Sequence, residues 1–66
     1  MNAIEQLRRA TLDARQRTGD NCISTRAEGG RVQIVRTVPQ EGGSFEVLAL
    51  SGWLPVDAAV DTLAAL

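Results

Sequence analysis

Two neighbouring segments rich in β-branched and apolar residues constrain the fold of this chain most strongly. Residues 31–38 and 44–50 have the composition of β-strands, and Pro39, Gly42 and Gly43 interrupt the pattern between them. Because the interruption is short, the two segments are expected to pair in an antiparallel manner. The remaining elements must pack around this pair.

A helix is expected on each side of the strand region. Residues 3–18 carry apolar or small side chains at helical spacing, namely Ala3, Ile4, Leu7, Ala10, Thr11 and Ala14. Asn2 is suited to cap the first turn, and Gly19 is a natural left-handed terminator. Residues 55–65 have a second apolar stripe, and Pro55 fits the first turn of a helix because its missing N–H is not needed there.

A weak strand at residues 22–27 is predicted before the central pair, since Ile23 and Thr25 alternate with more polar neighbours. Residues 28–30, with the sequence Glu-Gly-Gly, predict a tight connection to the next strand. The element order is then α-β-β-β-α. We therefore predict a single small globular domain, residues 1–66, of the α+β class, with a three-stranded antiparallel meander and two helices packed on one face.

This element order is similar to that of double-stranded-RNA-binding domains, which have a comparable length. That family carries lysines at the start of its second helix, where they contact phosphates. The corresponding residues 55–59 here contain Asp57 and no lysine. The resemblance is therefore one of topology, and it does not imply RNA binding.

Side-chain alternation predicts which face of the sheet is buried. In the second strand, Val32 and Ile34 form the better core face. The third strand is apolar on both faces toward its end. We expect Phe45 and Val47 to join Val32 and Ile34 beneath the helices.

The opposite face of the sheet is then left open, because two short helices cannot cover both sides. Its expected apolar centre consists of Val35, Leu48 and Leu50, and its expected polar rim of Arg31, Gln33 and Glu46. Protein interfaces combine a desolvated centre with a polar rim in this way. These six residues are the predicted partner-binding surface.

The small size of the chain also favours a partner. A domain of 66 residues buries only about 60% of its unfolded surface and is marginally stable without a staple. Cys22 is the single cysteine and cannot form an internal disulfide, and no secretory signal is recognised, so a reducing cytoplasmic location is expected. The longest uncharged stretch, residues 47–56, is too short to span a membrane, so no membrane partner is expected.

The charges are distributed unevenly. Residues 1–18 hold four arginines against two acids, and residues 19–66 hold three arginines against six acids, so that +2 and −3 give the net charge of −1. Such a balance attracts nucleic acid only locally. A nucleic-acid-binding module that uses the first helix is the alternative hypothesis, with Arg8, Arg9, Arg15 and Arg17 as contacts and Arg31 and Arg36 in support.

Residues that carry catalytic chemistry are scarce. The chain has no histidine and no tyrosine, so general acid–base catalysis would depend on carboxylates alone. Asp57 and Asp61 share a helix face but supply too few oxygens for a calcium site. Cys22 has no histidine or lysine to activate it. No catalytic, metal or cofactor site is predicted, and the two Gly-Gly pairs are interpreted as turns.

Two large apolar residues fall outside the predicted stripes. Trp53 lies in the expected linker between sheet and second helix, where plugging the end of a small core is favoured over anchoring a partner. Leu12 lies off the apolar stripe of the first helix, and a lone exposed leucine carries little functional weight.

The favoured hypothesis is a small non-enzymatic protein-binding module, an adaptor or inhibitor that occupies a surface of a larger protein. By analogy of class, compact proteins of this kind include inhibitors that phages and mobile elements direct against bacterial systems. Self-association to a homo-oligomer is also expected, since an open sheet face and a free third-strand edge would serve it. Salt dependence separates this hypothesis from nucleic-acid binding, because phosphate contacts weaken steeply as salt rises.

Overall fold

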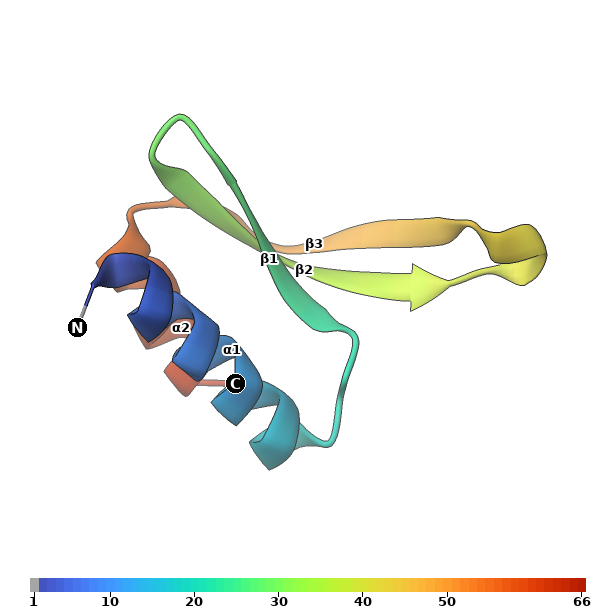
Figure 1. Ribbon diagram of the computed structural model, residues 1–66, viewed down its shortest axis with the longest axis horizontal. Coiled ribbons are helices and arrows are strands. Elements are labelled where there is room, and N and C mark those ends of the chain that lie inside the picture. The colour runs from blue at the N-terminus through green and yellow to red at the C-terminus, as the bar shows by residue number, and fades with distance from the viewer. Residues whose placement is uncertain (1) are drawn as a thin grey trace.

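The computed structural model describes residues 2–66 and confirms the predicted order of elements (Figure 1). These are α1 (Ala3–Thr18), β1 (Ile23–Glu28), β2 (Arg31–Pro39), the short 3-10 turn η1 (Glu41–Gly43), β3 (Phe45–Leu54) and α2 (Val56–Ala64). The strands form one antiparallel sheet in the order β1-β2-β3. The chain is therefore an α+β domain with a three-stranded meander.

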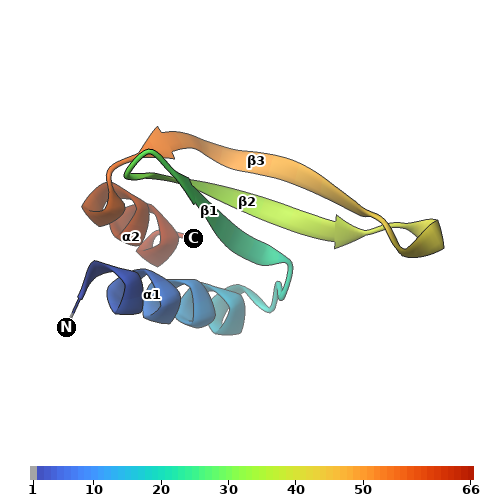
Figure 2. The same cartoon turned by 45° about the horizontal axis from the view of Figure 1, so that its top comes forward.

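The two helices lie side by side beneath one face of the sheet, as predicted (Figure 2). The centre of the core is formed by Ala14 of α1, Ile23 of β1, Ile34 of β2 and Leu63 of α2. Small residues at the helix contact allow the helices to approach the sheet closely, since Ala14 and Ala59 are both fully buried. One residue from each of four elements thus holds the domain together.

Local sequence signals account for the limits of α1. The Asn2 side chain accepts a hydrogen bond from the Glu5 N–H at 2.8 Å, which satisfies one free amide of the first turn. Gly19 ends the helix with φ of 72°, and its N–H donates to the Arg15 carbonyl. The predicted stripe is buried at Thr11 and Ala14, whereas Ile4 in the first turn is exposed.

The β1–β2 connection is a two-residue turn, Gly29-Gly30. Both residues have positive φ, 58° and 77°, as the mirror-image turn that matches the twist of a hairpin requires. The predicted tight connection is confirmed, and it places Ala27 opposite Val32 and Thr25 opposite Ile34.

Strand β3 is longer than predicted. The expected linker of residues 51–54 continues the strand after a bulge, and it places Trp53 opposite Gln33 and Leu54 opposite Val32. The bulge leaves the Ile34 N–H without a backbone acceptor, and the Ser51 hydroxyl accepts from it at 3.0 Å. Helix α2 then begins directly after Pro55.

The predicted faces of β3 are wrong by one residue. Leu48 pairs with Arg36, and Val47 pairs with Thr37. Directly opposed residues share a face, so Leu48 lies on the side of Ile34 and the helices, while Phe45 and Val47 lie on the other side. The alternation of β3 could not reveal this, because both of its faces are apolar.

Beyond the helices, β2 and β3 continue as a projecting hairpin (Figure 1). We call residues 37–50 the arm, and the rest of the domain the base. The radius of gyration is 11.8 Å, whereas a compact chain of this length has about 10.8 Å. The accessible surface is 4467 Å², against about 4,100 Å² for a compact monomer of this mass. The arm thus adds surface without adding core.

Candidate functional site

The six residues of the predicted partner-binding surface do not form one open face. Val35 is only 3% exposed and Gln33 only 8%, so neither is available to a partner. Arg31, Glu46, Leu48 and Leu50 are exposed. Because Val35 pairs with Ala49 on one face and Leu48 with Arg36 on the other, the predicted centre is split between the two sides. The prediction of a single patch on one sheet face is therefore wrong.

Gln33 belongs to a structural row across the sheet. Its side-chain carbonyl accepts from the Arg26 guanidinium at 2.8 Å, and its amide donates to the Ser51 carbonyl at 3.0 Å. The Arg26 guanidinium also lies 5.4 Å from the centre of the Trp53 ring, which is a cation–π distance. Trp53 pairs with Gln33 and therefore lies on the face remote from the helices. The prediction that it plugs the end of the core is wrong.

The largest concentration of exposed apolar side chains lies on the β3 part of the arm. We call these four residues the arm surface: Phe45, Val47, Leu48 and Leu50. Phe45 is 65% exposed although it is the only phenylalanine of the chain. The arm surface includes both sides of the strand, since Val47 and Leu48 point to opposite faces.

The backbone geometry shows which groups of β3 face solvent. The Thr37 N–H donates to the Cys22 carbonyl at 2.9 Å, so Thr37 faces β1 and its neighbour Arg36 faces β3. Arg36 and its partner Leu48 therefore exchange hydrogen bonds, and the backbone groups of Val47 point outward. The same alternation directs Phe45 and Ala49 outward. Within residues 2–66, these three outward N–H groups have no hydrogen-bond acceptor.

Two groups on the other sheet edges are blocked. At the outer edge of β1, the Arg15 guanidinium of α1 donates to the Ile23 carbonyl at 2.6 Å. Where β2 extends past β1, Pro39 occupies the position whose N–H would face outward. Charged side chains and prolines at an edge are ordinary means of preventing strand pairing. The outer edge of β3 carries neither proline nor lysine in residues 45–54, and Glu46 is its single charge.

Three of the six arginines of the alternative hypothesis, Arg15, Arg17 and Arg36, are engaged within the fold. Arg17 pairs with Asp13 at 3.0 Å and donates to the carbonyls of Leu66 and Leu63 at 2.7 and 2.9 Å. A guanidinium is favourable there, because the carbonyls at the end of α2 carry partial negative charge. Arg17 therefore joins α1 to the end of α2.

Arg36 is held by Asp20 in the α1–β1 connection, at 2.7 Å. The hydrogen bond from Arg36, together with one from the Cys22 N–H, holds the pKa of Asp20 below its ordinary value. The same contact raises the pKa of Arg36. The Arg36 side chain is partly exposed, but its guanidinium has a structural partner.

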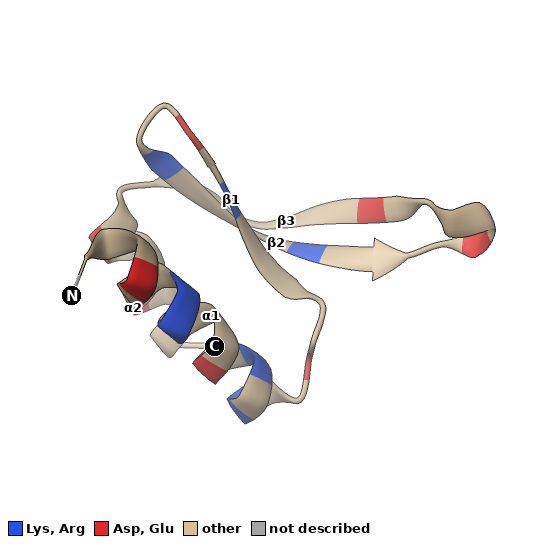
Figure 3. Cartoon of the chain, in the orientation of Figure 1, with Lys and Arg blue, Asp and Glu red and all other residues tan. Residues whose placement is uncertain are grey.

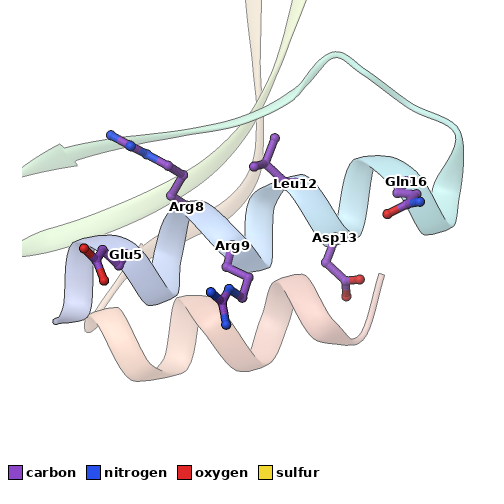
Figure 4. Close-up of a pocket in the computed structure, with 6 residues that line it drawn as sticks. All are labelled: Glu5, Arg8, Arg9, Leu12, Asp13 and Gln16. Atoms are coloured by element: carbon purple, nitrogen blue, oxygen red, sulfur yellow. The ribbon is translucent and has the colours of Figure 1, made fainter. Parts of the chain in front are cut away.

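The outer side of α1 forms no converging site. Its shallow depression is lined by Glu5, Arg8, Arg9, Leu12, Asp13 and Gln16. In Figure 4, Arg8 and Leu12 extend from one side of α1, and Arg9 and Asp13 extend from the other. Blue and red segments alternate along α1, whereas the arm carries few charges (Figure 3). Leu12 is exposed and does not belong to the core.

The described part of the chain holds no cluster of three or more acidic, cysteine or histidine side chains that could bind a metal ion. Cys22 is a half-buried free thiol. Every buried polar side-chain atom in residues 2–66 has a hydrogen-bond partner, so no orphaned group points to a cofactor. No helix among these residues is long and apolar enough to cross a membrane.

Comparisons with protein-family models, with curated proteins and with solved structures found no match to this chain.

Proposed function

We propose that this protein is a non-enzymatic protein-binding module and that its arm is the contact surface. The observation that carries the proposal is the coincidence of the arm surface with the unprotected outer edge of β3. Exposed apolar residues clustered in this way are typical of interaction sites in small proteins. The module acts as an adaptor or inhibitor by occupying a surface of its partner.

The distribution of the apolar side chains favours strand addition as the binding mode. Phe45 and Val47 lie on one face of β3, and Leu48 lies on the other. A partner that docks flat on the sheet would cover only one of these sets. A strand added at the β3 edge places side chains beside both sets and also satisfies the outward N–H groups.

The nucleic-acid alternative has less support. Four of the seven arginines make contacts that stabilise the domain, namely Arg15, Arg17, Arg26 and Arg36. Arg8 and Arg9, on the outer side of α1, point in different directions (Figure 4). Phosphate-driven binding needs several cations aligned along one path.

A free thiol at Cys22 suits a reducing compartment such as the cytoplasm.

Affinity capture with matched variants tests this function. Tagged wild-type protein is compared with Leu48→Glu on the arm and with Leu12→Glu, the same change at an exposed position of α1. We expect Leu48→Glu to abolish capture of the partner and Leu12→Glu to retain it. An apolar protein interface should change little between 50 and 200 mM salt.

Arg9→Glu serves as the control for the alternative. If Arg9→Glu removes binding and Leu48→Glu does not, the arm is not the contact surface. A loss of about 10³ or more in affinity over the same salt range would indicate phosphate contacts instead.

A further inference from the structure

We propose that the strand added to the β3 edge is β3 of a second copy of this chain. The two strands would run antiparallel about a two-fold axis at Val47 and join the two sheets into one. This inference rests on the proposed function, because it names the partner of the same edge. Dimers with two-fold symmetry use one self-complementary surface on both subunits.

The usable part of the edge is a short regular stretch. Residues 45–49 lie between the turn η1 and the bulge that begins after Ala49. Within this stretch the outward residues are Phe45, Val47 and Ala49. Only a two-fold axis at Val47 gives each of the three outward residues a partner in the second copy. In that register Phe45 pairs with Ala49 of the other copy, and Val47 pairs with Val47 of the other copy. Each such pair exchanges two N–H···O bonds.

The side chains are complementary in this register. Phe45, the largest side chain of the stretch, meets Ala49, the smallest, and the two Val47 side chains meet at the axis. On the other face, Glu46 lies opposite Leu48 of the second copy. An axis at Glu46 would instead place two like charges directly opposite each other, which is unfavourable. The register at Val47 thus combines complete hydrogen bonding with good packing.

The shape of the monomer provides room for this contact. In both views, β3 lies on the side of the sheet remote from α1, and the arm extends past both helices (Figures 1 and 2). Among residues 2–66, eight large hydrophobic residues are exposed, and four of them form the arm surface. A second copy at the edge shields these four without requiring the base to move.

Val47→Pro tests the contact selectively. The Val47 N–H points outward, so proline removes no bond within the sheet, and edge strands tolerate proline at such positions. By symmetry the substitution removes two intermolecular bonds, and it should weaken dimerisation by roughly tenfold or more in sedimentation equilibrium. A wild-type protein that stays monomeric at about millimolar concentration would overturn the proposal.

Cysteine cross-linking in a Cys22→Ser background tests the register, whether or not the proline variant folds. In the proposed dimer the two Val47 Cα atoms are about 5.5 Å apart, within the range of a disulfide. Val47→Cys should therefore form covalent dimers under mild oxidation. The Phe45→Cys variant alone should form no covalent dimer, but a mixture of the Phe45→Cys and Ala49→Cys variants should form one.

Equal cross-linking of Phe45→Cys and Val47→Cys would contradict the register. The experiments distinguish failure of the dimer proposal from failure of the protein-binding proposal. If the protein stays monomeric but Leu48→Glu still abolishes capture of another protein, the second copy is wrong and the binding arm remains. If neither dimer nor capture depends on the arm, both are wrong.

Discussion

The base and the arm use similar residues in opposite ways. Ile34 in the base has no exposed surface, because α1, α2 and two neighbouring strands surround it. Leu48 in the arm lies on the same face of the sheet, yet it is 42% exposed. The arm projects past the helices (Figure 1). Hydropathy alone does not distinguish the two positions. The difference shows that the base holds the core and that the apolar side chains of the arm stay exposed.

The two regions also differ at their edges. In the base, Arg15 occupies the Ile23 carbonyl at the edge of β1, and Pro39 occupies an outward position on the β2 edge of the arm. The β3 edge of the arm has no comparable protection in residues 45–49. Small proteins that must stay monomeric block such edges. The open edge beside exposed apolar residues supports the proposed partner strand.

Truncating one large apolar residue in each region should produce the largest contrast. Ile34→Ala should lower the free energy of unfolding by about 2–5 kcal/mol, because it leaves a cavity at the centre of the core. Leu48→Ala should cost about 1 kcal/mol or less in dilute protein. Urea denaturation of both variants measures the difference. Equal losses would show that the arm contributes to the core and that the division into base and arm is wrong.

The bulge at the junction of the two regions should give the next largest effect. Ser51→Ala removes the acceptor of the Ile34 N–H and leaves that amide unsatisfied in the interior, at a cost of about 1–3 kcal/mol. Ser44→Ala, in the hairpin loop, is the matched control and should change stability little. A neutral Ser51→Ala variant would mean that another group satisfies the Ile34 amide.

The Asp20–Arg36 pair, which connects α1 to the start of the arm, should have the smallest effect. The folded pKa of Asp20 lies below its unfolded value of about 3.9. Its contribution is therefore present above that pH and is lost as the pH falls through the folded pKa. The melting temperature of Asp20→Asn should lie slightly below that of the wild type at pH 6, and the two should converge as the pH falls through the folded pKa of Asp20.

Arg36→Gln removes the partner of Asp20 and should reproduce this pH-dependent difference. If the Asp20→Asn difference persists unchanged at acid pH, the ion pair is not its cause.

Local signals predicted much of the fold. The limits of α1 could be predicted from the sequence, because Asn2 caps its first turn and Gly19 ends it with a positive φ. The first hairpin could be predicted because Gly29 and Gly30 both adopt the positive φ that its turn requires. The element order followed from hydrophobic periodicity. The end of β3 could not be predicted in this way, because Ser51 and Gly52 resemble a linker but form a bulge within the strand.

The candidate site could be predicted only in part. Leu48, Leu50, Glu46 and Arg31 are exposed, as expected. Val35 was misplaced because burial on the far face depends on neighbouring strands and on the row of Arg26, Gln33 and Trp53, which no local pattern reveals. Phe45 and Val47 were assigned to the core because alternation cannot orient a strand that is apolar on both faces. The exposed α1 residue Ile4 was misplaced for a similar reason, because a helical stripe does not show where its partner ends.

Amide hydrogen exchange along β3 at two protein concentrations tests the central claim most directly. In dilute protein, the Glu46 and Leu48 amides should be protected by β2, while the outward amides of Phe45, Val47 and Ala49 should exchange rapidly. In concentrated protein, these three outward amides should become protected as well, because the edge is paired. If Val47 exchanges as rapidly in concentrated as in dilute protein, the β3 edge does not pair with a second copy.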